Sequence, residues 1–187
     1  MKKITLSSFI LASALLFSAC NNSQKEDSKE LAEEQNEQKF DDTNLEDDTE
    51  FAVAAAEGSM LEVKLGELAQ TNGAAQSVKD FGKTMVADHS KANEELSALA
   101  KQKNITLPMS LSDEKQKDFD KLAEKKGKDF DKDYAAFMVD DHEKDVREFE
   151  KTAKDAKDPD IKAWAGGKVS TLQHHLEMAK TVKDGLK

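Results

Sequence analysis

Three of the four histidines in this chain fall where a helix would turn them toward a protein core. Each follows an apolar residue by three or four positions, the spacing that puts two side chains on one face of a helix. Imidazole and carboxylate groups inside a helical bundle are ligands for a transition metal such as iron, manganese or zinc. The candidate ligands are Glu57, Glu62, His89, His142 and His175. The candidate supporting residues are Asp88, Asp141, Tyr134 and Glu177.

The lengths of the expected helices place these histidines at one height. If one helical hairpin turns near residue 73, His89 is level with Glu57 on the opposite helix. If a second hairpin turns near residue 158, His142 is level with residues 174 and 175. His89 and His142 each lie about 15 residues into their helices, so they meet at mid-length whether those helices run parallel or antiparallel. We therefore expect three imidazoles to come together in the middle of the bundle.

A buried polar cluster without a metal is the alternative interpretation of the same residues. A histidine on an apolar face is commonly hydrogen-bonded to a carboxylate, here Glu57 or Asp141. Di-iron bundles use two further glutamates and two Glu-x-x-His pairs. This chain has no such pair, because His174-x-x-Glu177 has the reverse order. It also has no phosphate-binding glycine loop, nucleophile elbow or cysteine suited to thiol catalysis, so we name no catalytic residue.

Apolar residues repeat every three or four positions in four long segments, which predicts four amphipathic helices. We expect a short fifth helix in the connection between the second and the third. The expected long helices span about 49–71, 74–103, 128–157 and 159–186, and the short one about 112–127. The predicted fold is all-α, an antiparallel four-helix bundle formed by residues 49–187. Gly58, Gly66 and Gly82 lie inside helices, where we expect the helices to approach closely.

The N-terminus has the features of an exported lipoprotein. An uncharged apolar run follows Lys2 and Lys3 and is typical of a secretory signal, being short for a membrane span. Small residues precede Cys20, the sole cysteine, and resemble the bacterial lipoprotein cleavage box. We expect a signal peptide over residues 1–19, a membrane anchor through lipid on Cys20, and an acidic flexible linker over residues 20–48. The expected location is the cell envelope, at the outer membrane and facing the periplasm or the surface.

The charge of the mature chain disfavours one class of partner. Removal of the signal leaves 26 basic against 38 acidic side chains, a net charge of −12. A strongly negative protein repels the phosphates of nucleic acids. We therefore expect no nucleic-acid partner, and the sequence identifies no protein partner.

Several of these segments together resemble the bacterial family catalogued as domain of unknown function 4142. The matching residues are Phe51, Ala55, Ala56, Gly58, Glu62, Met85, Val86, Asp88, His89, Phe130, Asp131, Tyr134, Met138, Val139, Asp141, His142, Phe149, Asp158, Pro159, Leu172, His175 and Leu176. The resemblance covers about residues 50–183. It implies a ferritin-like helical fold in exported, often lipid-anchored envelope proteins, and no established reaction. Val169-Ser170 stand where the family commonly has Leu-Pro, and His175 rather than His174 matches the family position.

Two functions follow from these patterns. The preferred interpretation is a non-enzymatic envelope lipoprotein, a helical module that acts by interaction or in stress protection, because the ligand set falls short of a di-iron centre. The alternative is a ferritin-like metal-binding protein with a Glu/His site at mid-bundle and redox activity.

Overall fold

The computed structural model describes residues 27–41 and 43–186, and this part of the chain forms six helices. They are α1 (Ser28–Phe40), α2 (Glu46–Asn72), α3 (Gln76–Lys103), α4 (Asp113–Ala123), α5 (Gly127–Asp155) and α6 (Pro159–Gly185). The described residues contain no strand, only an isolated bridge between Gly73 and Gly127. The prediction of an all-α fold is therefore confirmed.

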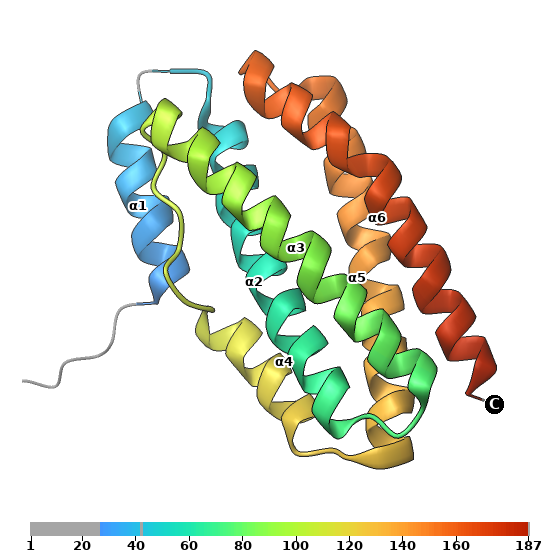
Figure 1. Ribbon diagram of the computed structural model, residues 1–187. Coiled ribbons are helices and arrows are strands. Elements are labelled where there is room, and N and C mark those ends of the chain that lie inside the picture. The colour runs from blue at the N-terminus through green and yellow to red at the C-terminus, as the bar shows by residue number, and fades with distance from the viewer. Residues whose placement is uncertain (1–26, 42, 187) are drawn as a thin grey trace, which may run out of the picture.

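The four longest helices form two antiparallel hairpins that pack against each other (Figure 1). One hairpin is α2 with α3, and the other is α5 with α6; α2 contacts α5, and α3 contacts α6. The connection from α3 to α5 runs back along the molecule and contains α4, so α3 and α5 begin at the same end (Figure 1). Each long helix is consequently antiparallel to the two long helices that it contacts.

Each hairpin turn is held by a carboxylate from the other hairpin. Asp131 of α5 accepts hydrogen bonds from the backbone N–H groups of residues 74 and 75, at 2.9 and 2.8 Å. Asp48 of α2 accepts from the backbone N–H groups of residues 157 and 158, at 2.9 and 2.6 Å. Both aspartates are buried. These charge-assisted bonds supply partners for N–H groups at helix starts and fix the two hairpins in register.

Local sequence signals set several helix ends. Asp158 accepts hydrogen bonds from the backbone N–H groups of residues 160 and 161, and Pro159 occupies the first turn of α6, as the Asp-Pro pair predicts. Ser112 caps α4 by accepting from the N–H of Lys115. Asn104 ends α3 in the left-handed conformation, with φ of 58°.

Two apolar clusters fill the interior on either side of a polar layer. The larger cluster includes Leu61, Leu65, Phe81, Met85, Phe130, Tyr134 and Met138. The smaller cluster includes Ala52, Ala56, Leu96, Ala100 and Ile161. Because the polar layer lies between apolar clusters, its side chains are removed from water and must find partners inside the protein.

Glycine allows α2 and α3 to touch at one crossing. A Cβ atom on Gly66 would lie 2.6 Å from the carbonyl oxygen of Gly82, and a Cβ on Gly82 would lie 2.7 Å from that of Gly66. The predicted close approach is confirmed for these two residues. It is wrong for Gly58, where a Cβ atom would meet nothing within 4 Å.

The expected flexible linker is wrong for residues 28–40, which form α1 and pack against α2. Ala32 and Asn36 are 1% and 2% exposed. Asn36 accepts a hydrogen bond from the backbone N–H of Thr106 at 2.7 Å and donates one to its carbonyl at 2.8 Å. A small apolar residue and a paired amide thus dock α1, so the composition of the segment did not reveal its buried face. The predicted signal peptide and Cys20 lie outside the described residues.

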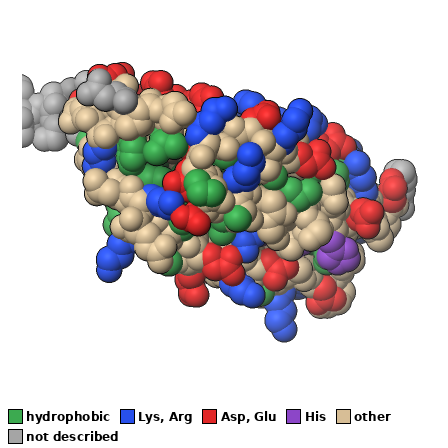
Figure 2. Space-filling view, turned by 90° about the horizontal axis from the view of Figure 1, so that it is seen from above, with side chains coloured by type: hydrophobic (Ala, Val, Ile, Leu, Met, Phe, Trp, Pro, Cys, Tyr) green, Lys and Arg blue, Asp and Glu red, His purple; other side chains and the backbone are tan. Residues whose placement is uncertain are grey.

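The charged sides of the helices face solvent. Figure 2 shows acidic and basic side chains interspersed over the face seen from above, with hydrophobic side chains in small groups between them. Among the described helices, none combines the length and the apolar character needed to cross a membrane.

Candidate metal centre

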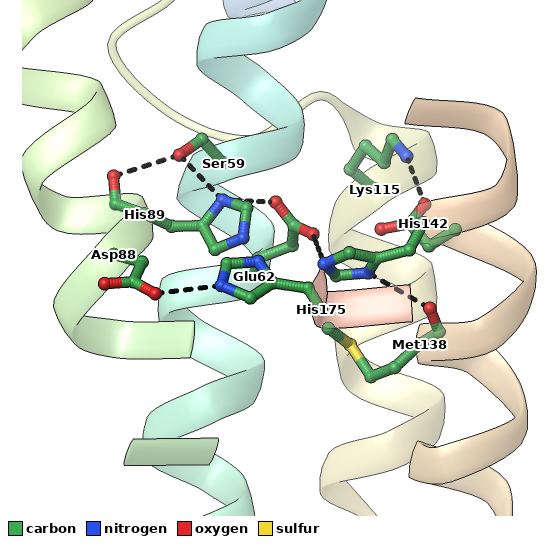
Figure 3. A network of polar contacts seen from close by, with 9 residues as sticks. Ser59, Glu62, Asp88, His89, Lys115, Met138, His142 and His175 are labelled. Atoms are coloured by element: carbon green, nitrogen blue, oxygen red, sulfur yellow. Dashed lines mark hydrogen bonds and ion pairs between the residues drawn. The ribbon is translucent and has the colours of Figure 1, made fainter. Parts of the chain in front are cut away.

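Four buried side chains from four helices meet in the polar layer (Figure 3). They are Glu62 of α2, His89 of α3, His142 of α5 and His175 of α6. The centroids of the three imidazole rings lie 5.3 to 5.8 Å apart. The prediction that three imidazoles meet in mid-bundle is confirmed, because the apolar spacing turns each of them inward from its helix. Their role as metal ligands stays a prediction.

Hydrogen bonds fix the tautomers of two of these rings. Nδ1 of His142 lies 3.0 Å from the carbonyl oxygen of Met138, which can only accept, so Nδ1 carries the hydrogen. Nε2 of His175 lies 2.8 Å from the carboxylate of Asp88 and donates to it. The remaining lone pairs are therefore on Nε2 of His142 and on Nδ1 of His175.

The third ring is oriented by two residues of α2. Nδ1 of His89 lies 2.7 Å from Oε2 of Glu62 and 3.3 Å from the hydroxyl of Ser59. That hydroxyl donates its single hydrogen to the backbone carbonyl of His89 at 3.0 Å, so it can only accept from the ring. Nδ1 of His89 is consequently the protonated nitrogen, and Nε2 has the lone pair.

The three lone pairs belong to atoms that have no hydrogen-bond partner among the described residues. These atoms are Nε2 of His89, Nε2 of His142 and Nδ1 of His175. Oε1 of Glu62 is also buried without a hydrogen-bond partner among the described residues. One ring nitrogen from each histidine lies within 4.8 Å of one from each of the others. Oε1 of Glu62 lies 3.4 Å from Nε2 of His142, without hydrogen-bond geometry. The three unpartnered ring nitrogens are acceptors, and imidazole nitrogens gathered in this way can surround a cation.

Burial keeps the three imidazoles uncharged at neutral pH. Desolvation lowers the pKa of His89 to about 4. It lowers the pKa of His142 to about 3, with a further contribution from the neighbouring rings of His89 and His175. Desolvation also lowers the pKa of His175, against the opposing hydrogen bond to Asp88. The rings are therefore in the form that binds metals without first having to lose a proton.

Carboxylates around the rings are shifted in the opposite direction. Burial, with the nearby charge of Asp141, raises the pKa of Glu62 well above its usual range. Burial also raises the pKa of Asp145, with the charges of Glu62 and Asp141 adding to the effect. Nζ of Lys115 lies 3.7 Å from Oδ1 of Asp141. Burial raises the pKa of the Asp141 carboxyl, and the positive charge of Lys115 opposes this effect. The site thus concentrates acidic groups that a bound cation would stabilise in their ionised form.

The other predicted site residues have different places. Glu57 accepts a hydrogen bond from the backbone N–H of Ser112 at 2.8 Å, so it anchors the start of α4 and is not among the imidazoles. Five residues along a helix correspond to a rotation of about 140°, which turns Glu57 and Glu62 toward different neighbours. Glu177 is exposed. Tyr134 is buried one layer away, stacked on Phe130 with centroids 5.4 Å apart.

Asp88 contacts the site through His175, whereas Asp141 pairs with Lys115 and acts on Glu62 and His89 through its charge. The sequence prediction missed Ser59 and Lys115 altogether. It also missed Asp145, which forms a second close group of potential ligands with Glu62 and His142. Asp145 follows His142 by three residues, so helical spacing contained the signal. Ser59 precedes Glu62 by the same spacing, whereas Lys115 had no comparable signal.

A family comparison accounts for most of the chain. No curated protein and no solved structure matches it. A match to one protein family extends over residues 30–182, from α1 into α6, and includes every residue of the centre. The match begins within α1, in accord with the docking of that helix on α2. On this evidence the chain belongs to the family described as Domain of unknown function (DUF4142).

Proposed function

We propose that this protein binds one transition-metal ion between the imidazoles of His89, His142 and His175. The supporting observation is that the two nitrogens of each imidazole ring have different roles. One nitrogen donates to a fixed acceptor, and the other presents a lone pair to a shared buried space. Histidines that bind metals are held in this way, since the donated hydrogen bond fixes both the tautomer and the orientation of the ring.

A metal-free polar cluster accounts for the arrangement less well. In such a cluster the buried atoms would satisfy one another, because a buried polar atom without a partner costs about 1–3 kcal/mol. Here four unpartnered atoms, one each from Glu62 and the three histidines, are gathered in a single layer. A cation that accepts several lone pairs at once would satisfy them together.

The donor set selects the class of metal. Three neutral imidazoles suit zinc or ferrous iron and are poor ligands for magnesium or calcium. Glu62 and Asp145 each place a carboxylate oxygen within 4.8 Å of a ring nitrogen of His142, so either is a candidate for a fourth ligand. One ion with three histidines needs no Glu-x-x-His pairs. The absence of those pairs was the reason for preferring a non-enzymatic interaction module, so the metal-binding alternative takes its place.

The same proposal includes a ferritin-like arrangement of the four long helices. Antiparallel neighbours joined by one long crossover are the connectivity of ferritin-like bundles, and metal sites in such bundles lie between facing helices. The crossover from α3 to α5 and the position of the three histidines support this assignment.

Metal analysis of the full chain, purified without a histidine tag, tests the proposal. We expect one equivalent of zinc or ferrous iron per chain and no stoichiometric calcium or magnesium. The His89→Ala, His142→Ala double variant should lose this metal. His174→Ala is the matched control, because His174 is exposed and lies beside His175 on the same helix. Failure of every transition metal to bind, or equal binding by the double variant, would overturn the proposal.

We also propose that the protein is anchored in the bacterial envelope, at the outer membrane, through lipid on Cys20. The sequence around this sole cysteine supports the proposal. Cys20→Ser should move the protein from the membrane pellet to the soluble fraction. Unchanged sedimentation with membranes would contradict it.

A further inference from the structure

A cleft of about 210 Å³ leads from the protein surface to the metal centre. Residues of α2, α3, α5 and α6 line it, so it lies between the two hairpins. Glu62, His89 and His175 line its inner end. The centre is thus reached from outside, although its three imidazoles are each at most 5% exposed.

Aromatic rings form part of the lining of this cleft. Phe51 packs edge-to-face on Phe149 and on Trp164, with ring centroids 4.9 and 6.1 Å apart. Phe149 and Trp164 lie 5.6 Å apart, so the three rings form one continuous group. Aromatic and aliphatic walls with a few polar groups at one end are typical of small-molecule sites.

Gly58 keeps one side of the cleft open. It lies inside α2 and lines the cleft, and a Cβ atom there would meet nothing within 4 Å. Glycine is unfavourable in a helix interior compared with alanine. At Gly66 a close approach of α3 requires glycine, but no packing contact requires it at Gly58. The missing side chain of Gly58 leaves open space in the cleft, about one turn of α2 from Glu62.

We propose that the cleft binds a small molecule with one ring-sized apolar group and one oxygen donor that coordinates the metal. This inference rests on the proposed metal site, and it names the class of ligand. The apolar group would lie against Phe51, Phe149 and Trp164, and the oxygen donor beside His89 and His175. An engineered cavity of about 150 Å³ accepts benzene, so this cleft has room for a single ring with a short head group.

Two hydroxamates that differ only in their apolar group test this proposal on the zinc-loaded full chain. Benzohydroxamate carries a phenyl ring, and acetohydroxamate carries a methyl group with the same metal-binding head. We expect benzohydroxamate to bind about 10- to 50-fold more tightly by calorimetry, since burial of the ring removes apolar surface from water. Only benzohydroxamate should change the fluorescence of Trp164, the single tryptophan. Equal affinity of the two probes, with no change in fluorescence, would overturn the proposal.

Gly58→Leu fills the cleft without altering a candidate ligand. It should keep stoichiometric zinc and lose most of the preference for benzohydroxamate. Gly167→Leu is the matched control: Gly167 is an exposed helical glycine outside the cleft, a Cβ atom there would also meet nothing within 4 Å, and the variant should keep the preference. An undiminished preference in Gly58→Leu would refute the assignment of the cleft. If Gly58→Leu does not fold, the comparison of the two probes on the wild-type chain decides. Zinc binding without a ring preference refutes the cleft alone, whereas absence of zinc binding refutes the metal site and the cleft with it.

Discussion

Replacing Glu62 with glutamine tests how many protons the site releases when a metal binds. One carboxyl oxygen of Glu62 accepts Nδ1–H of His89, and the other lies 3.4 Å from the lone pair of His142. Burial raises the pKa of this carboxyl well above its usual range, which favours the protonated form of Glu62 in the metal-free protein. A bound cation favours the carboxylate, and the proton must then leave. Glutamine has the same shape and no proton to release.

The imidazoles contribute little to this balance. At about pH 6, His89 and His142, with pKa values lowered to about 4 and 3, are already uncharged, and burial lowers the pKa of His175 as well. Glu62 should therefore contribute about one of the protons released when the metal binds. Three histidines with the ordinary pKa of about 6.5 would together release about two. Release of one proton makes the affinity rise about tenfold per pH unit, so zinc binding should strengthen as the pH rises.

Calorimetric zinc titrations at about pH 6, in two buffers with different ionisation enthalpies, measure the number of protons released. We expect Glu62→Gln to release about one proton fewer than the wild type. At neutral pH the variant should bind zinc about 10- to 100-fold more weakly, because glutamine cannot supply the negative charge that Glu62 places against Nδ1–H of His89 and beside the metal. This corresponds to about 1.4–2.7 kcal/mol.

Glu57→Gln is the matched control for this experiment. Glu57 is another buried glutamate of α2, but it bonds to the backbone of Ser112, and its amide counterpart can still accept that hydrogen bond. Its proton release and zinc affinity should equal those of the wild type. Equal proton release by Glu62→Gln and by the wild type would refute the role assigned here to the Glu62 carboxyl.

Three further predictions concern stability. Zinc at about 100 times its Kd should add about 2.7 kcal/mol to the free energy of unfolding and raise Tm by about 5–10 °C in calorimetry. A chelator should reverse the rise in Tm, and an equal rise in the His89→Ala, His142→Ala double variant would contradict the prediction. Asp131→Ala leaves two backbone N–H groups without their carboxylate and should lower the free energy of unfolding in urea by about 2–4 kcal/mol. The control Asp129→Ala changes an exposed aspartate and should lower it by less than about 0.5 kcal/mol. Similar losses in the two variants would be inconsistent with a stabilising contact of Asp131 with the other hairpin. Asn36→Ala removes both bonds to Thr106 and should speed hydrogen exchange in α1 only; unchanged exchange there would rule out docking through Asn36.

The meeting of the three histidines was predictable from sequence because it depends on two robust quantities. The period of a helix gives the direction of a side chain, and the position of a short hairpin turn gives its height. Both apply to His89, His142 and His175. The turns lie within a few residues of where glycine and Asp-Pro signals predict them, at Gly73 and Asp158.

Sequence spacing left Glu57 and Glu62 as equal candidates for a physical reason. α2 contacts α1, α3, α4 and α5, so it is covered on several sides and buries polar residues on more than one face. Which buried glutamate meets the imidazoles depends on the arrangement of α4, whose start takes Glu57 as a partner. That contact joins segments 55 residues apart, and no local pattern predicts it.

The packing of α1 on α2 could not be predicted from the sequence for a related reason. Its buried positions are Ala32 and Asn36, which add little hydrophobicity to an acidic segment. The pair of hydrogen bonds between Asn36 and Thr106 does the positioning, and amide pairing across 70 residues has no signature in composition.

Anomalous diffraction at the zinc absorption edge, from crystals grown with zinc, tests the central claim most directly. We predict one strong peak about 2.0–2.1 Å from Nε2 of His89, Nε2 of His142 and Nδ1 of His175. Zinc bound only at surface carboxylates, with no peak among these three nitrogens, would contradict the account.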